Sequence, residues 1–248
     1  MAKVFLLFAL FFFHVSSFCE ENSVRLITGE YSPFTSAHLS ENGLLTKVVI
    51  ESFEAKGVEV KKVNFAPWKR ASYETEQAMF DATFPYAKNR SREERFFYSD
   101  ILHKGKLHFI TVKEMEKDFQ KEKNWKGKVI CHPLGWNIEQ VQEEVEKYQL
   151  LLTRTSDVET CFRLLAAKRV DLINLNITFA KYIIRNLYGD LDKFSFLKDK
   201  VKDDFVYLMV SKKNPRAKLI IDQFNEGLKK LKRNGRYRAI LNESQSPR

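Results

Sequence analysis

Cysteine is scarce in this sequence, and cysteine and histidine do not cluster anywhere along it. Of 248 residues, 3 are Cys and 5 are His. No two cysteines have the close spacing of the ligand pairs in zinc sites, and the histidines are scattered. We therefore expect neither a metal ion nor a cofactor.

Long apolar runs are also missing, with one exception near the N-terminus. Residues 4–13 are all apolar and follow Lys3, but ten residues are too few to cross the roughly 30 Å hydrocarbon core of a membrane as a helix. The small residues Ser16 and Ser17 come soon after. This pattern predicts a secretory signal peptide over residues 1–19, cleaved after Cys19 or, as the alternative, after Ser17. We expect the mature chain to be exported, soluble and periplasmic.

Removal of the signal would leave Cys131 and Cys161 as the only cysteines. The remaining length, roughly 229 residues, is enough for one large domain or two lobes. An exported protein can hold such a cysteine pair as a disulfide. The sequence leaves open whether these two are bridged, because it does not give the distance between their Cα atoms.

Acidic residues are scarce in the C-terminal segment 212–238. It has ten Lys or Arg against two Asp or Glu, so it carries +8 of the formal net charge of +10. Because the rest of the chain is nearly balanced and we expect export, we do not expect a nucleic-acid partner. Ile220, Phe224, Leu228 and Leu231 recur at helical spacing, which predicts an amphipathic helix with a solvated basic face. A docking surface for an acidic partner or an anionic membrane is the alternative.

Strand and helix patterns alternate along the rest of the chain. Runs typical of strands cover residues 24–28, 58–65, 81–84, 107–112, 128–131, 150–153, 170–174 and 205–210. Helical patterns cover residues 44–56, 67–78, 139–147, 156–167, 178–186 and 214–234. The alternation, interrupted by a charge-rich connector at 113–123, predicts an α/β fold of two lobes joined by two crossing segments. In such folds, ligands bind beyond the carboxyl ends of the strands.

Three arginines lie close together in the stretch 81–100, DATFPYAKNRSREERFFYSD. Arg90, Arg92 and Arg95 sit in a short connection that apolar residues hold at both ends. A guanidinium held in this way presents a planar fork of donors that fits a carboxylate. Solvated surface charge is the alternative for arginines in a polar loop.

In their order and spacing, five segments resemble the extracellular solute-binding proteins of the amino-acid type, family 3, which deliver ligands to ABC importers. The segments are TGEYSPF, RSREERFFYSD, GKVICHPLG, SDVETCFRLLAAKRVDL and KKNPRAKLIIDQFNEGLKKLKRNGRY. The resemblance implies a periplasmic-binding-protein type II clamshell. Lobe 1 would comprise residues 20–112 and 207–248 and lobe 2 residues 113–206, with hinges near Val112 and Val210. A small carboxylate-bearing ligand, an amino acid or a related polar compound, would be captured by hinge closure.

The resemblance also implies which residues contact the ligand in lobe 1. The Tyr-x-Pro-Phe element that lines the family's pocket corresponds to Tyr31 and Phe34. The aromatic residue that stacks on the ligand after the second strand corresponds to Trp68. The family's carboxylate-binding arginine lies seven residues before the Ser of a Phe-Ser-Asp element, and counting back from Ser99 gives Arg92.

Two further residues have hydrogen-bond donors that could contact a ligand in the cleft between the two lobes. Arg70 lies on the same predicted helix as Trp68, and Tyr86 follows the strand that precedes the arginines. A surface ion pair is the alternative for Arg70, and a solvent-facing hydroxyl is the alternative for Tyr86.

The sequence departs from the family pattern at several of its ligand positions. Asn176 stands where amino-acid binders have the aspartate that pairs with the ligand ammonium, and Thr28 stands where many have another aspartate. Trp136 and Asn137 replace small hydroxyl residues of lobe 2. A carboxylate ligand without a free ammonium, or a larger aromatic or peptide-like compound between Trp68 and Trp136, therefore fits these residues at least as well as a standard amino acid.

Two other functions use the same fold. One is ligand sensing for a membrane receptor, which needs the same closing cleft as transport. The other is an exported dehydratase, which needs an acid or base in the cleft. No mapped cleft position is a carboxylate, so we expect a binding protein and not an enzyme. Its expected partners are the ligand and a membrane ABC permease or sensor, and we expect a monomer.

Overall fold

The computed structural model describes residues 22–134 and 136–243. The signal peptide expected over residues 1–19 lies outside the described residues. Within the described part, none of the helices combines the length and the apolar character that crossing a membrane requires.

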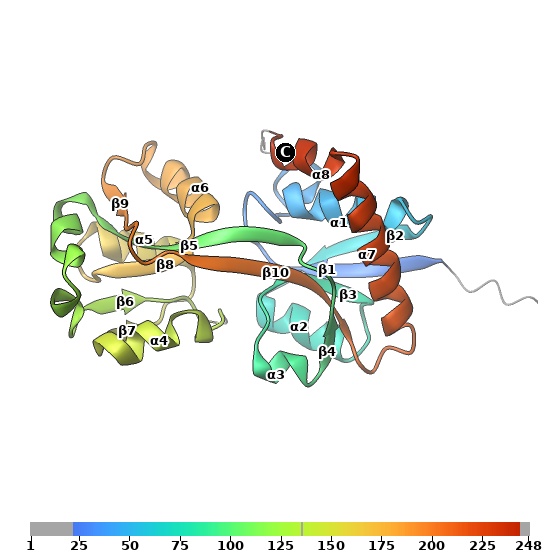
Figure 1. Ribbon diagram of the computed structural model, residues 1–248, viewed down its shortest axis with the longest axis horizontal. Helices are drawn as coiled ribbons and strands as arrows, with labels where there is room; N and C mark the ends of the chain where they lie inside the picture. The colour runs from blue at the N-terminus through green and yellow to red at the C-terminus, as the bar shows by residue number, and fades with distance from the viewer. Residues whose placement is uncertain (1–21, 135, 244–248) are drawn as a thin grey trace, which may run out of the picture.

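The described residues form two lobes of alternating strands and helices (Figure 1). The strands are β1 (Ser23–Thr28), β2 (Glu59–Phe65), β3 (Ala82–Tyr86), β4 (Phe96–Tyr98), β5 (His103–Val112), β6 (Val129–Cys131), β7 (Leu151–Thr153), β8 (Leu172–Asn176), β9 (Phe194–Phe196) and β10 (Lys202–Ser211). The α-helices are α1 (Leu44–Glu54), α2 (Trp68–Glu76), α3 (Arg90–Glu93), α4 (Glu139–Tyr148), α5 (Val158–Ala166), α6 (Ile177–Tyr188), α7 (Ala217–Arg233) and α8 (Arg236–Leu241). The 3-10 helices are η1 (Ser40–Asn42), η2 (Lys113–Gln120) and η3 (Glu122–Trp125).

The strands follow the order β2-β1-β3-β10-β5-β8-β6-β7, with β4 beside β10 and β9 beside β5. In lobe 1, β1 pairs in parallel with β2 and β3. In lobe 2, β6 pairs in parallel with β7 and β8. The long strands β5 and β10 run antiparallel from one lobe to the other (Figure 1). This confirms the predicted α/β clamshell of two lobes joined by two crossing segments.

The crossing point of β5 and β10 differs from the prediction. The two strands pair with each other between Lys202–Val206 and His103–Leu107. Val112 instead pairs with Phe194 inside lobe 2, and Val210 pairs with Phe97 inside lobe 1. Val112 and Val210, near which the hinges were expected, therefore lie within the lobes and not at the crossing itself. The apolar pattern missed the crossing because the paired segments, HKGK and KDD, are mostly polar.

The basic C-terminal segment is the amphipathic helix that its periodicity predicts. Ile220, Phe224, Leu228 and Leu231 of α7 are all buried in the core of lobe 1. Gly235 has a φ of +82°, a conformation that favours glycine, and ends this helix.

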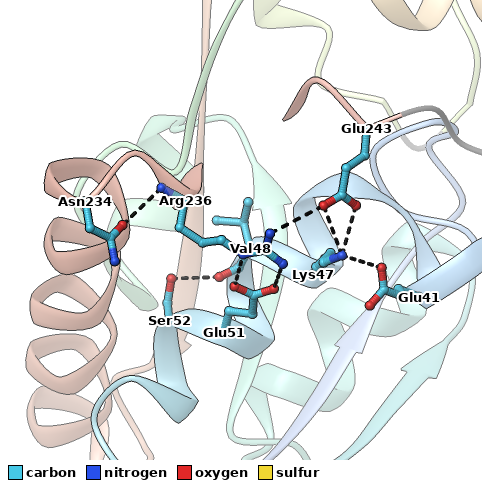
Figure 2. Close-up of polar contacts among 8 residues, drawn as sticks. All are labelled: Glu41, Lys47, Val48, Glu51, Ser52, Asn234, Arg236 and Glu243. Atoms are coloured by element: carbon cyan, nitrogen blue, oxygen red, sulfur yellow. Dashed lines mark hydrogen bonds and ion pairs between the residues drawn. The ribbon is translucent and has the colours of Figure 1, made fainter. Parts of the chain in front are cut away.

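The short helix α8, which was not predicted as a separate element, follows Gly235 and packs beside α1. Figure 2 shows how its charges are used: Arg236 donates from Nε and Nη2 to the two carboxylate oxygens of Glu51, at 2.8 and 2.6 Å. Lys47 of α1 lies between Glu41 and Glu243. Part of the positive charge of this segment is thus neutralised within lobe 1.

A disulfide joins Cys131 at the end of β6 to Cys161 in α5, with the Cα atoms 5.6 Å apart. Both cysteines are fully buried in the core. The sequence left open whether these two cysteines are bridged, and in the structure they are.

Candidate functional site

The carboxyl ends of the parallel strands in the two lobes face each other. The segments that follow β1, β2 and β3 in lobe 1 meet the segment that follows β6 in lobe 2. Between them lies a cavity of about 80 Å³. Its lining consists of Tyr31, Trp68, Pro85, Tyr86, Ala87, Arg92, Trp136, Asn137, Gln140, Asp204 and Val206.

Six of the nine candidate ligand residues line this cavity, and three do not. The six are Tyr31, Trp68, Tyr86, Arg92, Trp136 and Asn137. The structure brings them together from segments far apart in the sequence, as the clamshell predicts. That they bind a ligand stays a prediction.

Phe34 and Arg70, which were expected at the ligand, do not line this cavity. Phe34 is buried in the core of lobe 1, where its ring packs 5.2 Å from that of Tyr31 and 5.1 Å from that of His103. Arg70 is exposed, and its Nε lies 2.6 Å from a carboxylate oxygen of Glu74 one turn along α2. The surface ion pair weighed as the alternative for Arg70 is what the structure shows.

Arg92 is held in the cavity by its short helix and by Tyr86. Its backbone N–H donates to the side chain of Asn89, which caps α3, at 2.8 Å. Its Nη1 donates to the carbonyl of Ala87 at 3.1 Å, and its guanidinium lies 4.9 Å from the centre of the Tyr86 ring. Within the described part of the chain it has no carboxylate partner. The remaining guanidinium donors are therefore free for an anionic group.

The other two arginines of this stretch lie on the surface. Arg95 pairs with Glu76, with 2.5 Å between Nη1 and the carboxylate oxygen, and Arg90 is exposed. The family pattern, in which the arginine lies seven residues before a serine, pointed to Arg92 from Ser99. Of the three arginines, Arg92 is the one that lines the cavity.

Three aromatic side chains form one side of the cavity. The Tyr31 ring meets Trp68 edge-on at 6.4 Å and Trp136 edge-on at 6.0 Å. Gly29 allows this arrangement, because a Cβ there would lie 2.5 Å from Cε2 of Trp68. Tyr31 also packs 4.5 Å from Phe179 of lobe 2. These rings, together with a hydrogen bond of 3.4 Å from Asn89 to Asn137, connect the two lobes.

Asn176 is buried and does not line the cavity. Its side-chain oxygen caps α6 by accepting from the backbone N–H groups of Thr178 and Phe179. Its Nδ2 donates to Asp204 at 2.9 Å. Gly105 on β5 leaves room for this contact, because a Cβ there would lie 2.0 Å from Nδ2. The amide therefore orients a carboxylate from another strand.

Asp204 is the main site residue that sequence reasoning missed. It lies on the crossing strand β10, is only 5% exposed, and lines the cavity. Burial raises the pKa of Asp204, and the hydrogen bond from Asn176 opposes the shift only in part. Within the described part of the chain, it has no cationic partner. The sequence did contain a signal for this residue. Asp204 is two residues before Val206 and four before Leu208, so on a strand its side chain lies on the same buried face as theirs.

The charge of Asp204 also acts on its aromatic neighbour. Burial, and then the negative charge of Asp204, raise the pKa of Tyr31 well above its ordinary value. The phenol therefore stays neutral and can donate or accept a hydrogen bond at physiological pH. The cavity thus combines a guanidinium and a buried carboxylate, neither of which has an ion-pair partner among the described residues, with a neutral aromatic surface.

The described residues were also compared with the side-chain groups that bind metal ions. Across the residues that the structure describes, His, Cys, Asp and Glu form no group of three or more that could hold an ion.

Comparison with known proteins shows the fold of the chain. No family model and no curated protein matches the chain. Among solved structures, the substrate-binding protein of an amino-acid ABC transporter is similar, with a TM-score of 0.71 and 18% identity over 89% of this chain and 97% of that one. The chain therefore has the fold of the substrate-binding proteins of amino-acid ABC transporters.

Two other similar structures are a sensor domain and an ancestral binding protein. One is a histidine kinase sensor domain similar to periplasmic binding proteins, with a TM-score of 0.70 and 16% identity over 88% of this chain and 93% of that one. The other is an ancestral amino-acid-binding protein described as a precursor of cyclohexadienyl dehydratase, with a TM-score of 0.68, 15% identity and the same two coverages.

Proposed function

We propose that this chain is an exported solute-binding protein that captures a small ligand with an acidic group and a cationic nitrogen. The observation that supports this most strongly is that Arg92 and Asp204 line the same cavity and have no ion-pair partner among the described residues. Asp204 is buried, and a buried charge without a partner is costly, whereas Arg92 is half-buried. A ligand with a cationic nitrogen would remove the cost at Asp204, and a zwitterion would also supply an acidic group to the donors of Arg92.

We infer a different role for Asn176 from the one that the sequence alone suggested. On the sequence alone, the amide at this position suggested a ligand without a free ammonium. Asp204 places a carboxylate beside that amide, 2.9 Å from its Nδ2, and on the cavity wall. We propose that Asp204 receives the ligand nitrogen and that Asn176 holds the carboxylate in position.

We propose that the two lobes close on the ligand, because residues from both lobes line the cavity. Lobe 1 supplies Arg92, Trp68 and Tyr31, while lobe 2 supplies Trp136 and Asn137. A ligand that contacts both sets favours the arrangement in which the lobes meet. The paired segments of β5 and β10 at the crossing are the places where the lobes would rotate.

We propose that the closed form is read by a membrane ABC importer, and that the protein acts as a periplasmic monomer. Its similarity in fold to the binding protein of an amino-acid ABC transporter supports this role. A receptor-linked sensor is the alternative, because a histidine kinase sensor domain has the same fold.

Dehydration of a cyclic acid is a second candidate, and Asp204 favours it. The expectation of a non-enzyme rested on the mapped cleft positions, none of which is a carboxylate, but Asp204 was not among them; it lines the cavity, and burial raises its pKa. Such a carboxyl could donate a proton to a hydroxyl group, which leaves as water, and the resulting carboxylate could accept the proton that the neighbouring carbon loses as the double bond forms. Appearance of a dehydrated product from a hydroxylated cyclic acid, lost in Asp204→Asn, would favour the enzyme over the binding protein.

The proposal predicts that ligands need both charged groups. We expect L-leucine or L-phenylalanine to raise the melting temperature, and the matching acid or amine that lacks one charge to bind at least about tenfold more weakly. Thermal shift followed by calorimetry with L-phenylalanine, 3-phenylpropionic acid and phenethylamine, and with the leucine equivalents, measures this.

Asp204→Asn is the matched variant for this panel. It keeps a side-chain oxygen for Asn176 and removes only the charge, so it should bind the amino acid and the des-amino acid almost equally. Equal binding of the two by the wild-type protein would show that Asp204 does not recognise a ligand nitrogen.

A further inference from the structure

Positive charge gathers on the outside of lobe 1, where α7 ends and α8 follows it (Figure 1). The charge belongs to exposed cations of α7, α8 and the start of β5, which we call the basic patch. Its members are Lys104, Lys229, Lys230, Lys232, Arg233 and Arg238. None of them lines the cavity between the lobes. The proposed ligand site therefore makes no use of their charge.

Contacts within lobe 1 join the three parts of the basic patch. The hydroxyl of Tyr237 in α8 donates to the carbonyl of Leu102 at 3.0 Å, which places α8 against the start of β5, where Lys104 lies. At the end of α7, Nζ of Lys232 donates to the carbonyl of Ile101 at 2.6 Å and lies 5.3 Å from the centre of the Tyr237 ring. The end of α7, α8 and the start of β5 thus form one surface.

The side chains of the basic patch form no ion pair within the described residues. Those of Lys229, Arg233 and Arg238 have neither an ion pair nor a hydrogen bond there. Lys230 and Lys232 donate only to backbone carbonyls. Most nearby carboxylates are held by cations outside the patch, as in the pairs of Glu226 with Lys56 and of Glu51 with Arg236. The patch therefore keeps most of its charge for an external partner.

The cations are spread over the surface and do not converge on one point. Helical spacing places Lys229 and Arg233 on one stripe of α7, with Lys230 and Lys232 on its two sides. Lys230 accordingly reaches a backbone carbonyl at the end of α1, at 3.5 Å, whereas Lys232 reaches one in the segment between β4 and β5. Donors spread in this way suit many anionic groups on an extended surface better than a single small anion.

We propose that the basic patch docks lobe 1 on a membrane surface that carries anionic phospholipid headgroups. Each Lys or Arg near such a surface adds to the attraction, which falls off within a Debye length. A membrane offers phosphate groups as a continuous layer, so it needs no matching hollow in the protein. The export expected from residues 1–19 would place the chain beside such a membrane, where the proposed importer also lies.

The contact is electrostatic and does not insert α7 into the membrane. The apolar side chains of this helix, Phe224, Leu228 and Leu231 among them, are buried in the core of lobe 1. A helix that lies in the membrane interface needs its apolar face for the acyl chains. Salt should therefore release the protein, because it screens charges at the surface.

The test measures co-sedimentation of the full mature chain with lipid vesicles. One set of vesicles contains phosphatidylcholine alone, and the other also contains about 30% phosphatidylglycerol. At low ionic strength we expect at least about tenfold stronger binding to the anionic set, and loss of that binding in about 1 M salt. Equal binding to both sets, no binding to either, or binding that this salt leaves unchanged would overturn the proposal.

Two double variants that remove the same charge locate the binding surface. Lys229→Gln/Arg233→Gln should weaken binding to the anionic vesicles at least about fivefold. Lys121→Gln/Lys123→Gln is the control, because these exposed lysines lie in lobe 2, and it should retain most of the binding. Neither pair lines the cavity, so both variants should bind L-phenylalanine like the wild-type protein. Equal losses of vesicle binding in the two variants would show that net charge alone drives it and would contradict the proposal.

Poly-L-glutamate distinguishes a membrane from an acidic protein as the partner. At the same ionic strength, we expect the wild-type protein to bind the anionic vesicles and the polymer to compete only weakly. If the protein binds the polymer but not the vesicles, and Lys229→Gln/Arg233→Gln loses that binding, the basic patch serves an acidic protein and the proposal fails.

Discussion

Arg92→Ala is expected to weaken the binding of a zwitterionic ligand by at least tenfold, which corresponds to 1.4 kcal/mol. The guanidinium has free donors in the cavity and no carboxylate partner within the described residues. Its removal would leave the acidic group of the ligand desolvated without a charged donor. The fold of the loop should survive, because Asn89 caps α3 through the backbone N–H of Arg92, which alanine keeps.

Arg90→Ala is the matched control for this measurement. Arg90 lies two residues away on α3 and is exposed outside the cavity. Calorimetry with L-phenylalanine and with whichever amino acid gives the largest thermal shift should therefore show an unchanged affinity. A loss of less than tenfold in Arg92→Ala, or equal losses in both variants, would show that Arg92 does not bind the carboxylate.

Loss of the disulfide between Cys131 and Cys161 is expected to destabilise the protein by about 3–4 kcal/mol, since the bridge closes a loop with a separation of 30 residues. For a chain of this length, this corresponds to a melting temperature lower by about 6–16 °C. The double variant Cys131→Ala/Cys161→Ala keeps the buried positions apolar, so it isolates the bridge from the burial of a new polar group.

Thermal unfolding with and without a reductant measures this effect. The reductant should lower the melting temperature of the wild-type protein and leave that of the double variant unchanged. Thiol titration of the folded mature protein should find no free thiol at either position. A wild-type melting temperature that the reductant does not move would contradict the assignment.

The regular elements of this fold could be predicted from the sequence where one face of each is apolar. The parallel strands of both lobes and helix α7 carry alternating or helical patterns, and these determined the α/β clamshell. The crossing region could not be placed, because HKGK on β5 and KDD on β10 are polar segments that pair only with each other. Short elements such as β4 and β9, each of three residues, have no period long enough to detect.

Some residues of the candidate site could likewise be predicted from the sequence, and others could not. Tyr31 and Trp136 lie in the segments that follow β1 and β6, and the family resemblance was enough to place both at the cavity. Phe34 could not, because an aromatic in a turn fits a pocket or a core equally well. Asp204 was missed for a different reason, since its importance depends on Asn176, which is 28 residues away and meets it only through the pairing of β5 with β8 and β10.

Mass spectrometry of small molecules released from the denatured protein tests the central claim most directly. The mature chain would be purified without added ligand, beside Arg92→Ala prepared in the same way. We predict that the wild-type protein releases a compound with both an acidic group and a basic nitrogen, and that Arg92→Ala releases much less of it. Release of the same compound in equal amounts from both, or of a compound without an acidic group, would contradict the account.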